Sequence, residues 1–98
     1  MAAEAITIRD NADEGRYQLL LGDKVAGYAE YVLSPTTIVF THTVVEEKWN
    51  GRGLGSRLAR HVLDDARKRG LRVRPKCPFI RSYIESHPQY ADLVAPRT

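Results

Sequence analysis

Three glycines lie within five residues in the segment Asn50-Gly51-Arg52-Gly53-Leu54-Gly55. Glycine has no Cβ, so its backbone can take positive φ angles and a ligand can approach it closely. The apolar periodicity that starts at Leu54 predicts a helix directly after this segment. A helix N-terminus offers free N–H groups and a partial positive charge, and both favour a phosphate. The spacing therefore predicts a phosphate-binding turn; the alternative is a turn that only packs the helix on a sheet.

Two side chains elsewhere in the chain could do nucleophilic or acid–base chemistry. Cys77 precedes Pro78, a favoured first residue of a helix, and a thiolate beside Lys76 at such a helix start is expected to be stabilised. His42 lies within a β-branched strand and could act as a general base toward an amine or toward Cys77. The alternatives are a buried cysteine that fills space and a sheet-face histidine with one hydrogen bond. Cys77 and His42 are therefore the candidate catalytic residues.

The elements that must position these residues follow from the hydrophobic pattern. Alternation of apolar residues predicts strands, and apolar residues at helical spacing predict helices. The expected strands are 5–9, 16–21, 24–33, 36–46 and 71–74, and the expected helical segments are 55–69, 79–86 and 89–94. Antiparallel strands followed by strand–helix–strand predict an α/β (α+β) fold with helices on a mostly antiparallel sheet.

The strand at 36–46 determines where His42 points. Strict alternation puts every second side chain on the same face of a sheet. The expected faces are Ile38, Phe40, His42 and Val44 on one side, and Val39, Thr41, Thr43 and Val45 on the other.

Composition indicates one ordinary globular domain over residues 1–98. The chain is 43% apolar and 28% charged, which excludes a disordered class. No apolar stretch is long enough to span a bilayer, and the N-terminus lacks a signal-peptide pattern, so we expect a cytoplasmic protein without a membrane partner. A single cysteine excludes an intramolecular disulfide and a multi-cysteine zinc site, and no other metal constellation is present.

Charge is distributed unevenly along the chain. Residues 1–47 carry three basic and eight acidic side chains, whereas residues 48–98 carry twelve basic and four acidic ones. The basic half predicts an anionic partner, which could be nucleic acid, a membrane surface or a polyphosphate cofactor. The most basic stretch, Arg67–Lys76, lacks interleaved aromatic residues, so nucleic acid ranks last.

The glycine segment resembles the pyrophosphate-binding signature of the GCN5-related N-acetyltransferases, Gln/Arg-x-x-Gly-x-Gly/Ala. Asn50, Gly53 and Gly55 stand at its fixed positions, with Asn50 in place of the usual Gln or Arg. Four further segments occur in the order typical of a compact YjdJ-like subgroup of about 100 residues. They are His42–Val45, Leu63–Arg67, Pro75–Phe79 and His87–Tyr90, so the resemblance extends over nearly the whole chain.

The resemblance implies a minimal fold of this family, with a strand–pyrophosphate loop–helix–strand core, and acetyl-CoA as cofactor. The strand would hold the pantetheine arm and the loop the pyrophosphate, with Lys48, Arg52 and Arg57 as cationic helpers. The implied cofactor-binding residues are Thr43, Val44, Val45, Asn50, Gly51, Arg52, Gly53, Leu54, Gly55, Ser56 and Arg57.

The activity implied by the resemblance is transfer of acetyl from acetyl-CoA to an amine, such as a protein lysine, an N-terminus or a small amine. Cys77 would carry the acetyl group or act as an acid beside the CoA sulfur, and the acidic N-terminal half would suit a cationic acceptor. The alternative is a non-catalytic acyl-CoA-binding or regulatory module. The oligomeric state is left open, and a monomer is compatible with the sequence.

Overall fold

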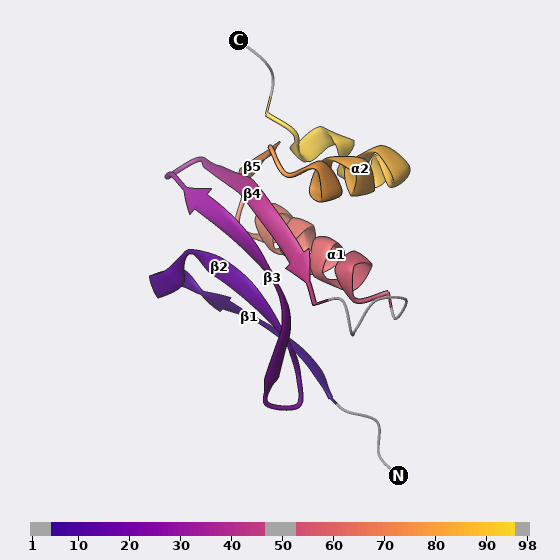
Figure 1. Ribbon diagram of the computed structural model, residues 1–98. Coiled ribbons are helices and arrows are strands. Elements are labelled where there is room, and N and C mark those ends of the chain that lie inside the picture. Colours follow the sequence, from indigo (N-terminus) through magenta and orange to yellow (C-terminus); the bar gives the residue numbers. More distant parts are fainter. Residues whose placement is uncertain (1–4, 47–52, 96–98) are drawn as a thin grey trace.

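A computed structural model of the chain describes residues 5–46 and 53–95, which form a sheet with helices packed against it (Figure 1). The strands in these residues are β1 (Ile6–Asn11), β2 (Arg16–Leu21), β3 (Lys24–Leu33), β4 (Thr37–Val45) and β5 (Arg72–Pro75). The helices are α1 (Leu54–Lys68) and α2 (Pro78–Ser86), with short 3₁₀ helices η1 (Ala12–Glu14) and η3 (Pro88–Leu93). Each strand and helix predicted from the sequence is present, with its ends shifted by at most two residues.

The sheet has the order β1-β2-β3-β4-β5 in the described residues. The first four strands form an antiparallel meander, because only short turns connect them. The fifth is parallel to β4, and α1 makes the crossover between the two. The mostly antiparallel α/β fold expected from the sequence is therefore confirmed.

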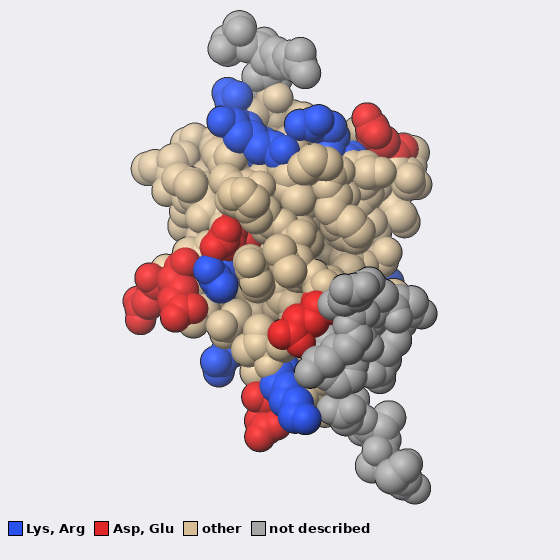
Figure 2. All heavy atoms as spheres, in the orientation of Figure 1, with Lys and Arg blue, Asp and Glu red and all other residues tan. Residues whose placement is uncertain are grey.

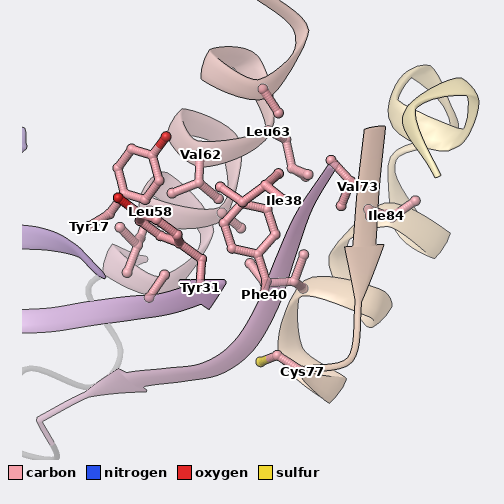
Figure 3. Close-up of a cluster of buried hydrophobic side chains, with 14 of the residues drawn as sticks. Tyr17, Tyr31, Ile38, Phe40, Leu58, Val62, Leu63, Val73, Cys77 and Ile84 are labelled. Atoms are coloured by element: carbon pink, nitrogen blue, oxygen red, sulfur yellow. The ribbon is translucent and has the colours of Figure 1, made fainter. Parts of the chain in front are cut away.

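The core lies between α1 and one face of the sheet. All six apolar residues that predicted an amphipathic helix are buried, among them Leu58, Val62 and Leu63. Figure 3 shows them meeting Ile38 and Phe40 of β4. Burying each large apolar side chain stabilises the fold by about 1.5–3 kcal/mol, so this contact holds β4 and α1 in register.

A β-bulge at Thr41 divides β4 into two halves. Tyr31 pairs with Phe40 but Glu30 pairs with His42, so Thr41 is an extra residue opposite β3. Before the bulge, Ile38 and Phe40 face the core; after it, the odd-numbered residues do, and Val45 packs against the core. The predicted assignment of the β4 side chains to the two faces of the sheet is therefore correct up to Phe40 and wrong beyond it. His42 and Val44 lie on the exposed face, opposite Thr43 and Val45.

A polar cluster fastens the C-terminal half of α1 to the sheet. The Tyr17 hydroxyl donates to Asp65 and the Tyr31 hydroxyl donates to Asp10. Arg69 Nη1 lies 3.4 Å from Asp65 Oδ2 and 3.6 Å from Asp10 Oδ2, so it joins the two pairs. Burial and the hydrogen bond to Asp10 raise the pKa of Tyr31 to about 12. Burial and the bond to Asp65 also raise the pKa of Tyr17.

The 3₁₀ helix η3 attaches to α1 through a second set of polar contacts. The Tyr90 hydroxyl donates to Asp64 Oδ1 at 2.7 Å, and burial together with this bond raises the pKa of Tyr90 to about 12. Arg67 donates to both oxygens of Asp92 at 2.9 Å.

Neither helix of the described residues is long and apolar enough to cross a membrane.

The raised tyrosine pKa values predict a loss of stability at high pH. Unfolded tyrosine ionises near pH 10, whereas folded Tyr31 and Tyr90 stay protonated to about pH 12. The unfolded state thus binds fewer protons than the folded state in this window, and the free energy of unfolding falls as pH rises from about 10 to about 12. Urea titrations at pH 9, 10.5 and 11.5 should show this fall, with a shallower slope for Tyr31→Phe. Parallel curves for the variant and the wild type would contradict the assignment.

Candidate cofactor and catalytic site

Strands β4 and β5, which run parallel, stop pairing in the middle of β4. Their last paired residues are Phe40 and Pro75, and the Cys77 N–H then donates to the Phe40 carbonyl at 2.9 Å. From Thr41 to Val45, no strand of the described residues pairs with β4 on this side. The backbone N–H and C=O groups of this edge are therefore available to an extended ligand that carries amide groups.

Cys77 lies where the strands part. It is the residue before α2, and Pro78 opens that helix as predicted. Its side chain is 3% exposed, and the thiol donates to Thr43 Oγ1 at 3.1 Å. Figure 3 shows the sulfur directed toward β4. The structure thus brings together two of the residues singled out from the sequence, the candidate catalytic thiol and the first of the expected pantetheine-binding residues.

His42 lies on the other face of the sheet. Its side chain is 72% exposed, and Nδ1 is 3.3 Å from Glu30 Oε1. Glu30 is also paired with Arg16. Because consecutive strand residues point to opposite faces, His42 faces away from Thr43 and from the thiol that Thr43 contacts. The structure does not bring His42 and Cys77 together, so proton transfer directly between them is not supported.

The first N–H groups of helix α1 have no acceptor among the described residues. Its first backbone bond runs from Arg57 N–H to the Gly53 carbonyl at 3.1 Å, which leaves Leu54, Gly55 and Ser56 N–H without a helical acceptor. Within the part of the chain that the structure describes, no side chain caps this end and no acidic residue lies in the first turn. Such an end has the partial positive charge and free donors that a phosphate requires.

The two described glycines of the segment are required for different reasons. Gly53 has φ +72°, and a Cβ there would meet no atom of the described residues within 4 Å, so these residues leave the space beside it open to a ligand. A Cβ on Gly55 would lie 2.7 Å from Phe79 Cζ, so this glycine allows the ring of α2 to pack on α1. The packing alternative that the sequence left open therefore applies to Gly55, and phosphate binding stays a prediction for Gly53.

A cavity of about 210 Å³ continues from this helix end along α2. The turns of α2 supply most of its lining, and His87 closes it, with Nδ1 2.8 Å from the Tyr83 carbonyl and its ring stacked on Tyr83. Of the lining residues, Ser82, Tyr83 and Ser86 lie in no segment singled out from the sequence; the spacing of 79, 83 and 87 on one helix face is the signal that could have found this surface. The lining residues are Ser56, Phe79, Ser82, Tyr83, Ser86 and His87.

Part of the predicted site lies outside the described residues. This applies to Lys48, Asn50, Gly51 and Arg52. Arg57, the remaining cationic helper, is exposed in the first turns of α1. No group of three His, Cys, Asp or Glu in residues 5–46 and 53–95 is arranged to hold a metal ion.

Comparison with known proteins identifies the family of the chain and agrees with its fold. The family of GCN5-related N-acetyltransferases matches residues 16–93, and the chain belongs to this family. A similar solved structure is the NMR solution structure of a GCN5-like protein from Staphylococcus aureus, with a TM-score of 0.68 and 20% sequence identity. The similarity covers 100% of this chain and 94% of the other. A search of curated protein sequences finds no match. Family membership supports acetyltransferase chemistry in general.

The open space at Gly53 leads to a stability prediction. An alanine there would clash with no atom of the described residues but would hold a positive φ, so Gly53→Ala should lower the free energy of unfolding by about 1 kcal/mol. Asparagine tolerates the left-handed region, so Gly53→Asn should lose less than about half of this. Urea unfolding of both variants measures the difference. Equal losses would show that backbone strain is not the reason for glycine at this position.

Proposed function

We propose that the protein is an acetyl-CoA-dependent N-acetyltransferase that transfers acetyl to an amine acceptor. The observation that carries the proposal is the parting of β4 and β5 after Phe40, next to the start of α1, which no side chain of the described residues caps. An unpaired strand edge can hold an amide-bearing arm, and a helix N-terminus can hold the phosphates at the end of that arm.

The described residues fit the parts of acetyl-CoA in order along the chain. The free edge at Thr43, Val44 and Val45 would bind the amides of the pantetheine arm. The N–H groups of Leu54 to Ser56 and the open space at Gly53 would receive the pyrophosphate, with Arg57 nearby as a cation. The bound cofactor supplies an acetyl group activated as a thioester.

Two groups on opposite faces of β4 would donate and accept the protons that move during the transfer. The Cys77 thiol lies beside this free edge and carries a proton on Sγ, held by Thr43; it could protonate a leaving sulfur or accept acetyl itself. His42 would accept the proton of an amine that arrives on the exposed face, and Glu30 orients its ring through Nδ1. Direct transfer and transfer through Cys77 remain the two routes.

Cofactor binding is tested by placing a carboxylate where the pyrophosphate is expected. Ser56 is exposed in the first turn of α1, where an acidic residue favours the helix, so Ser56→Glu should fold normally. Charge repulsion should raise the Kd for acetyl-CoA at least about tenfold in calorimetry. Gln18→Glu is the control, because it adds the same charge on the sheet and keeps the acceptor for Arg9. Failure of the wild type to bind acetyl-CoA would overturn the proposal.

Turnover is tested at the two catalytic candidates. With a panel of amines, Cys77→Ala and His42→Ala should each lower the rate of CoA release by at least about 100-fold while acetyl-CoA affinity stays within about threefold. Cys77→Ser keeps a donor toward Thr43, so a fully active serine variant would assign the cysteine a packing role. Tight binding of acetyl-CoA without turnover by the wild type would instead identify a non-catalytic acyl-CoA-binding module.

A further inference from the structure

A second cavity, of about 330 Å³, lies on the other flank of α2. It is bounded by β5, by α2 and by the segment that follows η3. Three cations, one carboxylate and an apolar floor line it, mainly Arg74, Lys76, Arg81, Ile84, Glu85 and Val94. Figure 2 shows Lys and Arg side chains gathered at this end of the molecule, over β5 and α2.

The positive charge of this cavity is not neutralised within the described residues. Arg67 and Arg69, in the same basic stretch, are paired with carboxylates. In contrast, the side chains of Arg74 and Lys76 make no hydrogen bond or ion pair in the part of the chain that is described. Arg81 donates only to carbonyls, those of Pro75 and Lys76, at 3.3 and 3.4 Å. Two residues of the basic stretch, Arg74 and Lys76, therefore bring unpaired positive charge to this cavity.

The remaining lining restricts the shape and charge of a ligand. Ile84 is buried, and Val94 and Ala95 are half-buried, so the floor is apolar. Glu85 at the rim repels a dianion more strongly than a monoanion. Arg74 and Lys76 are free to bind a single carboxylate. The cavity therefore suits a small molecule with a carboxylate next to an apolar group.

The position of the cavity connects it to the proposed reaction centre. Arg74, Pro75 and Lys76 directly precede Cys77, and Arg74 pairs with Val39 on the sheet face that also carries His42. Residues 79, 82, 83 and 86 of α2 line the first cavity, whereas 81, 84 and 85 line this one. The start of α2, where the thiol lies, is thus flanked by one cavity on the side of the expected cofactor and by another on the opposite side.

We propose that this second cavity binds the acceptor, and that the acceptor is a small apolar amine that also carries a carboxylate. This inference rests on the proposed acetyl transfer and reverses the expectation of a cationic acceptor. In the reaction the amine nitrogen forms a bond to the acetyl carbon while the carbon–sulfur bond of the thioester breaks. The amine gives up one proton to a base, and the sulfur leaves as the CoA thiol after gaining one proton.

The first experiment tests the cavity without any turnover. Isovalerate and isovaleramide have the same apolar body and differ in charge. Titration of the isotopically labelled protein with isovalerate should shift the amide signals of Arg74, Lys76 and Glu85 saturably, and isovaleramide should shift them at least about tenfold less. Arg74→Ala/Lys76→Ala should abolish the difference. The control Lys24→Ala/Lys68→Ala, which removes the same charge from exposed positions, should retain it. Equal shifts with the two probes, or none, would overturn the inference.

The second experiment tests the acceptor class. Leucine, isoleucine, valine and methionine are compared with their amides as acceptors, at saturating acetyl-CoA. The acids should have a kcat/KM at least about tenfold above the amides, and Arg74→Ala/Lys76→Ala should remove this preference through KM with acetyl-CoA affinity unchanged. A preference for the amides, or acetyl-CoA binding with no acid acetylated, would overturn the inference. Absence of acetyl-CoA binding would instead overturn the proposed function itself.

Discussion

The hydrogen bond from the Cys77 N–H to the Phe40 carbonyl is the last backbone contact that links the β5 side of the sheet to β4. Past this point the chain enters α2 instead of extending the sheet, and one edge of β4 pairs with no strand of the described residues. The bulge at Thr41 then turns Thr43 toward the thiol and His42 toward Glu30. The free edge and the thiol take their positions from where this pairing ends, and the imidazole takes its position from the bulge.

Much of the fold could be predicted from the sequence because it depends on local patterns. The apolar stripe from Leu54 to Ala66 predicts α1, since only one face of a helix can pack on a sheet. Strands β2 and β3 were predicted with the correct ends, because Gly22 and Asp23 mark the turn between them. Cys77 was correctly placed at a helix start, because proline is favoured at the first helical position.

The features that could not be predicted depend on contacts between residues that are far apart in the sequence. An inserted residue leaves the β-branched pattern of β4 unchanged, so the bulge at Thr41, and with it the outward direction of His42, has no sequence signal. Glu30 becomes the partner of His42 only through that shifted register. Gly53 and Gly55 are glycines for different reasons. The reason at Gly55 is the packing of Phe79 on the helix, a contact that the sequence does not show. Arg81 was overlooked because it lies outside the basic stretch that it joins in space.

The polar cluster of Asp10, Tyr17, Tyr31, Asp65 and Arg69 and the predicted phosphate-binding turn lie at opposite ends of α1. Asp65 is about 18 Å from Gly53 along a helix that rises 1.5 Å per residue. Arg74 and Lys76, which line the second cavity, are exposed and take no part in the hydrogen bonds and ion pairs of the cluster. Under the proposed function, exposed lining residues of this kind can change while these contacts stay intact, so selection for another acceptor would seldom conflict with selection for stability.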